Sequence, residues 1–337
     1  MQMTLDKGPT RVDMVDNVPG HRSNLEKLLA YNMDPACLRD DVVKNGVLRE
    51  DAWKAMDEKV LQIASDPTTV VDAFRSRGLT VTTNGLAKTV LRYEDVSDMN
   101  DAELSIAAEA EPAGDRVAYS TKGMPLPLCH KGFHINARAQ AESNALGDPL
   151  DTTQVAIATR KVIEKNEKVA CQGASSLAFG GYTLYGMEDF SSVVTGNVTA
   201  AWGDSSADEY QDIMNAIQAL RDVHHFGPYG VFVSGNWAEV LNENYGDAVT
   251  TQPLTKYERI MKHKQVAFVE VGEFMTDSRL IVVSLKEETF QIVIGLDIQV
   301  VEWVTMGGLR SHYLVWDIVL PRPRADQAGN CGIAVYS

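Results

Sequence analysis

The chain has 337 residues, of which 45% are hydrophobic and 23% charged, so it is long enough for two moderate domains, each with its own core. Its formal net charge of -15 argues against a dedicated nucleic-acid reader, which usually carries a basic face, but does not exclude a protein that encloses nucleic acid. The N-terminus lacks the apolar run of a secretory signal, and no stretch approaches 18 uncharged apolar residues, so we expect a soluble protein that is intracellular where it is made.

The first residues, 1 to about 46, are punctuated by proline and glycine and show little periodicity, apart from one short helical stretch around Ser23–Tyr31. A segment this long with so little pattern is unusual inside a compact domain, and an extended arm lying on a neighbouring subunit would account for it. A helix is predicted next over Arg49–Ser65, and Pro67 ends it. Residues 68–84 then have β-type and turn composition.

Residues 86–128 are typical of a long hairpin with an acidic, Ala-rich middle. Strand character is found over Thr89–Glu94 and again over Arg116–Thr121. Such a hairpin has few apolar residues with which to hold itself to a core, so it needs a partner surface.

The strongest predicted helix covers residues 151–171, with Asp151 or Thr152 as its cap and Gly173 as its end. A second amphipathic helix is predicted over Asp208–His225. The residues expected on the apolar stripes of the two helices are Val155, Ala158, Val162 and Val169 in the first, and Tyr210, Ile213, Ile217, Leu220 and His224 in the second.

The rest of the chain is predicted to be mostly strands. After a turn at Gly227-Pro228 comes a buried strand over Tyr229–Ser234, and Asn236 is expected to cap a helix over Trp237–Asn242. Further strands are predicted at Val266–Val271, Leu280–Leu285, Phe290–Ile294, Ile298–Thr305 and His312–Leu320, and a last short apolar run covers Ile333–Tyr336. This order of elements is an α+β pattern.

The four cysteines, Cys37, Cys129, Cys171 and Cys331, are far apart and form no CxxC pair, so we expect reduced and mostly buried thiols. Cys129-His130 with His134 is the most metal-like cluster. Zinc needs three or four ligands, however, and on a strand the cysteine would face away from the two histidines.

Other candidate pairs favour structural roles. His224-His225 is expected at a helix C-terminus, where a cation interacts well with the helix dipole. The glycine and serine pairs lack phosphate-loop and nucleophile-elbow patterns and suit turns, hinges or caps, and the acidic pairs suit solvated surface or helix starts. These pairs are Gly180-Gly181, Gly307-Gly308, Ser175-Ser176, Ser205-Ser206, Asp40-Asp41, Asp208-Glu209 and Glu287-Glu288. We therefore predict no catalytic residue, no cofactor-binding residue and no metal site, and a protein that is not an enzyme.

Four segments, in the same order along the chain, resemble encapsulin-type shell proteins. Residues 46–57, with Ala52-Trp53, resemble the N-terminal helix of that family, and residues 125–173 resemble its strand and long spine helix. Residues 227–234 are similar to its Gly-Pro-Tyr strand, and the chain from Gly295 onward is similar to its closing strands. Encapsulins share the Johnson fold with the major capsid proteins of tailed phages, so the resemblance implies an α+β protein with this major capsid fold.

The resemblance also implies a domain organisation. It consists of an N-terminal arm at 1–46, a P-domain helix region at 47–85, an E-loop hairpin at 86–128, a P-domain with the spine helix at 129–179, an A-domain at 180–290, and a return to the P-domain at 291–337.

The function implied first is that of a phage major capsid protein, self-assembling into hexamers and pentamers of an icosahedral shell. The shell would enclose dsDNA without sequence-specific binding, with portal, scaffolding or decoration proteins as possible partners and no membrane. It would be a virion component assembled in the host cytoplasm. The residues ahead of the matched helix and the long acidic hairpin favour this function over a compartment. Lys88 and Lys122 are available for an E-loop cross-link, but nothing in the sequence supports such a bond.

Two alternatives stay open. One is an encapsulin nanocompartment that encloses a cargo enzyme, which differs from a phage capsid in what the shell contains. The other is a cytosolic α+β enzyme with a dispersed site, for which a compact monomer would be the signature.

Overall fold

The computed structural model describes residues 56, 58–60, 62–63, 68–96, 116, 119–139, 142, 153–245, 254–306, 309–326 and 329–337. They fall into two units. Of the described residues, those within Val60–Lys131, Val155–Val300 and Val315–Ser337 form the larger unit, and the others form the smaller unit. The predicted N-terminal arm, the stretch Ser23–Tyr31 and most of the helix Arg49–Ser65 lie outside the described residues, although those described between 56 and 63 are helical.

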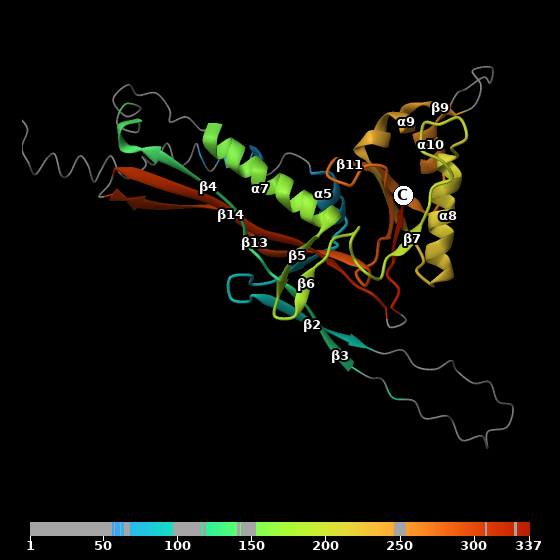
Figure 1. The fold of residues 1–337 in the computed structure, drawn as a ribbon, viewed down its shortest axis with the longest axis horizontal. Coiled ribbons are helices and arrows are strands. Elements are labelled where there is room, and N and C mark those ends of the chain that lie inside the picture. The colour runs from blue at the N-terminus through green and yellow to red at the C-terminus, as the bar shows by residue number, and fades with distance from the viewer. Residues whose placement is uncertain are drawn as a thin grey trace, which may run out of the picture. The chain divides into compact units, whose positions relative to one another are not determined.

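The larger unit contains a five-stranded sheet, whose edge strands are labelled β11 and β7 in Figure 1. Its strand order is β11 (Val266–Gly272), β8 (Tyr229–Ser234), β12 (Leu280–Ser284), β15 (Ile333–Tyr336) and β7 (Val194–Gly196). Strand β8 is parallel to β11 and antiparallel to β12. All six residues of β8 are buried, which is expected of a central strand with both faces covered.

The two faces of this sheet pack against different partners. Leu280 and Val282 belong to a core shared with α8 (Glu209–Asp222), whereas Ile281 and Val283 belong to a second core shared with α5 (Thr69–Arg75). This period-2 alternation places each face of β12 against its own cover. The first cover also includes the short elements η1 (Gly235–Trp237), α9 (Ala238–Asn242) and α10 (Lys256–Met261). Strand β9 (Asn244–Tyr245) pairs antiparallel with β10 (Leu254–Thr255).

A second sheet has the order β1 (Thr80–Thr82), β13 (Phe290–Thr305), β14 (Arg310–Pro323) and β4 (Cys129–Asn136). Strands β4 and β13 run from the larger unit into the smaller one, and β14 runs back into the larger unit. The two strands predicted at Phe290–Ile294 and Ile298–Thr305 form one continuous strand, β13. A Cβ at Gly295 would lie 2.8 Å from the Ile318 side chain and 3.1 Å from the Cα of Gly85. Glycine at this position therefore allows β13 to pack closely against Gly85 and Ile318.

The long predicted helix is confirmed as α7 (Thr153–Gln172), and its expected stripe is buried. Its last turn packs into two cores, through Val169 in one and through Ala170 and Cys171 in the other. The predicted cap residues at 151 and 152 lie outside the described residues. Among those that the structure describes, no helix is long and apolar enough to cross a membrane.

Gly173 ends α7 with a φ of +73°, and a Cβ at this position would collide with the backbone nitrogen of Gly186 and the Asp189 carboxylate. Replacing Gly173 with alanine is expected to lower the free energy of unfolding by about 2–5 kcal/mol, because left-handed strain and a backbone collision add together. Gly78→Ala is the matched control, since Gly78 has a φ of +72° but open space around it, and should cost about 1 kcal/mol. Equal losses for the two variants in urea denaturation would contradict this account.

The predicted hairpin is confirmed in its strands. β2 (Val90–Val96) pairs antiparallel with β3 (Tyr119–Pro125), with Tyr93 opposite Lys122. Its acidic middle lies outside the described residues. Strand β3 lies beside a second hairpin made of β5 (Ala174–Phe179) and β6 (Tyr182–Leu184).

The β-type composition of residues 68–84 is confirmed in strand β1 (Thr80–Thr82) but was misleading for Thr69–Arg75, which forms α5. Threonine and valine at the start of α5 favour strand, but the backbone N–H groups of Val70 and Val71 donate to the two carboxylate oxygens of Glu167 on α7, at 2.5 and 3.1 Å. A carboxylate at a helix N-terminus satisfies otherwise unpaired donors. A tertiary contact thus overrides local propensity.

Two smaller predictions were also wrong. Helix α8 ends at Asp222, and His224 lies beyond it, exposed and with a φ of +64°, so it is not on the apolar face. Asn236 does not cap α9, because its side chain binds Ser278 and Ser234 across the neighbouring loop. Asp208, by contrast, does cap α8 through the backbone N–H of Gln211.

Candidate functional site

The metal-like cluster of the sequence does not form a metal site in the described residues, where no group of three His, Cys, Asp or Glu side chains is arranged to hold an ion. The Cys129 thiol lies 3.8 Å from the backbone oxygen of Val162, and burial together with the nearby Asp317 carboxylate raises its pKa to about 11. It is therefore a protonated thiol, which is a poor nucleophile and a poor ligand. In the smaller unit, His134 lies 5.8 Å from His312 between ring centroids, and His312 stacks on Trp303.

Two further cysteines and His225 lie in positions that suit a structural role. Cys171 and Cys331 are free and buried, and burial raises the pKa of both thiols, that of Cys331 to about 12; Cys37 lies outside the described residues. His225 lies past the end of α8, with its Nε2 3.5 Å from the Asp326 carboxylate.

The paired glycines, serines and acids have mixed outcomes. Gly180-Gly181 forms the turn between β5 and β6, and Ser205-Ser206 lies in a turn, as predicted. Ser175-Ser176 was expected in a turn or cap but lies in strand β5. Glu287-Glu288 is exposed and Asp208-Glu209 begins α8, as predicted; Glu209 is buried and pairs with the Lys256 ammonium at 2.7 Å. Gly307-Gly308 and Asp40-Asp41 lie outside the described residues.

Two buried carboxylates on or beside α7 were not identified from the sequence. Burial raises the pKa of Glu167, although its two backbone donors on α5 oppose this shift. Asp317 on β14 accepts a 2.6 Å hydrogen bond from the Asn166 amide, and its other oxygen has no partner among the described residues. Burial raises the pKa of Asp317 to about 7.

Asp317 lines a cavity of about 360 Å³ between α5, α7, β13 and β14. Asp72, Arg75 and Asp297 also line it, so three carboxylates face one guanidinium. Part of the Asp72 carboxylate is already used, because Oδ2 accepts from the backbone N–H of Thr68 at 2.7 Å. The burial of Asp317 favours its protonated form near neutral pH. This makes Asp317 a candidate for pH-dependent stability rather than for catalysis.

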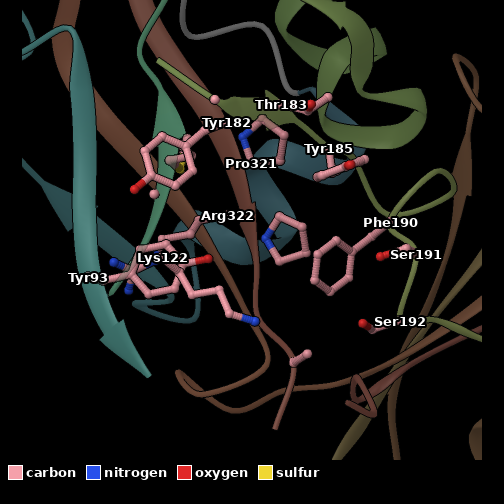
Figure 2. A pocket seen from close by; sticks show the side chains of 15 residues that line it. Tyr93, Lys122, Tyr182, Thr183, Tyr185, Phe190, Ser191, Ser192, Pro321 and Arg322 are labelled. Atoms are coloured by element: carbon pink, nitrogen blue, oxygen red, sulfur yellow. The ribbon is translucent and has the colours of Figure 1, made fainter. Parts of the chain in front are cut away.

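A second cavity, of about 260 Å³, is lined by β2, β3, the β5–β6 hairpin, the following loop and the end of β14 (Figure 2). We call it the arginine–tyrosine pocket. The residues that line it are Tyr93, Lys122, Gly123, Met124, Gly181, Tyr182, Thr183, Tyr185, Phe190, Ser191, Ser192, Pro321, Arg322, Pro323 and Ala325. Two of them are cationic, and none is acidic.

Local packing places the aromatic residues of this pocket. Gly123 on β3 leaves room for the Tyr182 ring, which would lie within 3 Å of a Cβ at that position. The Arg322 guanidinium reaches the buried carbonyl oxygen of the Gln291 side chain and lies 5.6 Å from the centre of the Tyr93 ring. Arg324 lies 5.5 Å from the same ring. Figure 2 shows Arg322 and Lys122 on the side of Tyr93, with Phe190 across the pocket.

The chemistry of the pocket is that of an anion-binding surface with aromatic walls. Burial and the Arg324 guanidinium lower the pKa of Arg322, but a guanidinium stays charged at neutral pH. No signal in the sequence identified this pocket, because its walls come from segments that are far apart along the chain. Lys122 was singled out only as a possible cross-linking residue.

Comparison with known proteins adds a family and a fold. Residues 42–304 match a family described as a family of unknown function (DUF6260). A curated relative, the type 1 encapsulin shell protein EncA of Myxococcus xanthus, is 24% identical over 206 residues. The matched segment covers 59% of this chain and 65% of that protein, which is less than two thirds of its length.

Solved structures match over most of the chain. The virus-like particle from Pyrococcus furiosus matches with a TM-score of 0.60 and 13% identity, covering 84% of this chain and 98% of the other. The capsid of Myoviridae phage XM1 matches with a TM-score of 0.59 and 12% identity, covering 81% and 93%. These likenesses show that the fold is the α+β major capsid (Johnson) fold, as the sequence resemblance implied.

Proposed function

Because the chain belongs to the family of unknown function DUF6260 and has the major capsid fold, we propose that it is a self-assembling shell protein. Specifically, it is the major capsid protein of a tailed phage, forming hexamers and pentamers of an icosahedral shell around dsDNA. Portal, scaffolding or decoration proteins are its further partners. Its place is the virion, and assembly takes place in the host cytoplasm.

The β2–β3 hairpin is the observation that carries this proposal. Tyr119, Ser120, Thr121 and Lys122 are exposed along β3, and Tyr119 leaves 69% of its surface accessible. A two-stranded ribbon is marginally stable alone in water. An exposed tyrosine on such a ribbon suits a contact with another protein surface, because tyrosine buries a large area and keeps a polar tip. A neighbouring copy supplies that surface in a shell.

The proposal also assigns regions of the chain to parts of the capsid fold. The arm is 1–46, the E-loop is 86–128, the A-domain is 180–290, and the P-domain is made of 47–85, 129–179 and 291–337. Within the last region, β15 pairs with β12 of the proposed A-domain, so the chain end contributes to both.

Assembly itself is the mechanism. Each contact between copies is weak, but repetition over symmetry makes the shell strong. The formal net charge of -15 keeps free subunits soluble and leaves packaged DNA loosely held, which suits genome release.

An encapsulin nanocompartment is the second candidate, favoured by the similarity to the encapsulin shell protein of Myxococcus xanthus. The comparisons do not separate the two, because the curated relative is an encapsulin shell protein whereas a phage capsid matches the fold over 81% of this chain. A cytosolic enzyme is disfavoured because the similar solved structures are a virus-like particle and a phage capsid, and because the Cys129 thiol is held protonated.

The contents of particles purified from the native producing cells test the proposal. We expect nuclease-protected double-stranded DNA inside the particles, measured after nuclease treatment and opening with denaturant. Particles treated with nuclease after opening are the control and should retain no DNA. A stoichiometric protein cargo without protected DNA would contradict the phage assignment and favour the nanocompartment.

A further inference from the structure

Positive charge without a carboxylate partner gathers around Tyr93. Among the described residues, Arg322 contacts the neutral side chain of Gln291 and the Tyr93 ring, and its buried Nε has no acceptor. Among the described residues, Arg324 pairs with no carboxylate, and its guanidinium lies against the same ring. Two guanidinium groups this close repel each other, so an anion placed beside them gains energy from both.

The arginine–tyrosine pocket beside them has room for one or two side chains. Its volume of about 260 Å³ is below the roughly 300–1,000 Å³ of pockets for drug-sized molecules. Tyr93, Tyr182 and Phe190 give it aromatic walls, and Lys122 extends toward its middle (Figure 2). This shape suits the carboxylate of an extended peptide better than a folded domain or a nucleic-acid duplex.

Residues 94–115 of the same chain have the complementary charge. They contain eight Asp and Glu residues and no Lys or Arg. We propose that the arginine–tyrosine pocket binds carboxylates from residues 94–115 of a second copy of this chain. The inference rests on the proposed function, since it names one contact through which copies of a shell protein assemble.

Charge and number favour this occupant over others. Every copy carries one pocket and one acidic segment. In a closed assembly, each pocket can therefore bind the acidic segment of a neighbouring copy, and the contact repeats around the shell. Nucleic acid is the other anion to consider, but it does not come in the one-to-one ratio to the pocket that the acidic segment of each copy provides. Within one chain, β2 leads away from the pocket, because Val96 lies three residue pairs beyond Tyr93, about 10 Å along the strand.

Binding of a synthetic peptide of residues 94–115 to the full-length chain tests the contact directly. The pocket variant is Lys122→Glu with Arg324→Glu, which changes one lining residue and the cation beside Tyr93 and keeps the contact of Arg322 with Gln291. The matched control is Lys88→Glu with Lys131→Glu, two exposed cations outside the pocket. Fluorescence anisotropy should show saturable peptide binding that the pocket variant weakens about tenfold or more and the control leaves unchanged. Binding should also weaken between 0.1 and 1 M salt, because the Debye length falls from about 10 to 3 Å.

Assembly of mixed variants tests whether the contact joins two copies. The segment variant is Glu109→Lys with Glu111→Lys. Each variant alone should assemble only at a subunit concentration about tenfold higher than the unaltered chain. A mixture of the pocket and segment variants should recover assembly, because each chain then offers what the other needs. If the segment binds its own chain's pocket, only a chain carrying both changes recovers, and the proposal is overturned.

The remaining outcomes are also decisive. The neutral pair Lys122→Gln and Arg324→Gln, with circular dichroism melting as the check on folding, replaces the charge-reversed pair if that pair fails to fold. Shells that assemble equally well from the unaltered chain and the pocket variant contradict this inference and leave the proposed function standing. If the unaltered chain forms no shell, the proposed function fails, and the peptide titration still tests the pocket. Displacement of the peptide by a dT20 oligonucleotide that binds more tightly overturns the choice of occupant.

Discussion

Glu167→Ala is expected to lower the free energy of unfolding by about 2–4 kcal/mol. The substitution leaves the backbone N–H groups of Val70 and Val71 buried without an acceptor, and each such group costs about 1–3 kcal/mol. Removing a buried carboxylate whose pKa is raised offsets part of this loss. Urea denaturation of the purified chain at neutral pH measures the change.

Glu167→Gln is the matched control for this prediction. A glutamine keeps one oxygen that accepts from α5 and removes the charge, but its NH2 group faces the second backbone donor, so the expected loss is smaller than that for alanine and not zero. An alanine variant as stable as the unaltered chain would show that α5 does not depend on this contact with α7.

Asp317 is expected to make stability fall as the pH rises toward and through neutral. Its folded-state pKa, about 7, is raised from the ordinary 3.8, so the folded chain binds a proton that the unfolded chain has released. The stability contributed by this proton is fully present below about pH 4 and is lost as the pH rises through about 7. With about 1.4 kcal/mol for each pKa unit, the difference amounts to about 2–4 kcal/mol after allowance for local relaxation.

Asp317→Asn should therefore flatten the pH profile and be more stable than the unaltered chain above pH 7. The variant keeps an oxygen that accepts from the Asn166 amide. Asp297→Asn is the control, because it removes an exposed carboxylate from the same cavity and should leave the profile unchanged. Denaturation series from pH 4 to 9 distinguish the variants, and identical slopes for Asp317→Asn and the unaltered chain would contradict the assignment.

Regular patterns in the sequence predicted the elements of the fold well. The apolar stripe of α7 and the strand at Leu280–Leu285 were both predicted from the sequence, and the structure contains them as α7 and β12. Helix α5 was missed because its stability comes from Glu167, which lies almost a hundred positions further along the chain. From the sequence alone, Glu167 was one of several charged residues beside the apolar stripe.

The candidate sites were less predictable than the fold. Asp317 sits in a strand whose neighbours are apolar, and only the packing of α7 over it explains its burial. The arginine–tyrosine pocket needs Tyr93, Tyr182 and Arg322 together, and no spacing in the sequence links these three. The order of elements, in contrast, carried the resemblance to shell proteins, because topology survives where individual side chains do not.

Electron microscopy of the expressed full-length chain tests the central claim most directly. If the chain is a shell protein, the purified material contains closed particles of uniform size, and their reconstruction shows icosahedral symmetry with capsomers of five and six copies. Reconstruction also places the β2–β3 hairpin of each copy on a neighbour. A chain that stays monomeric across subunit concentration, salt and pH, with no closed particles in any condition, would contradict the account.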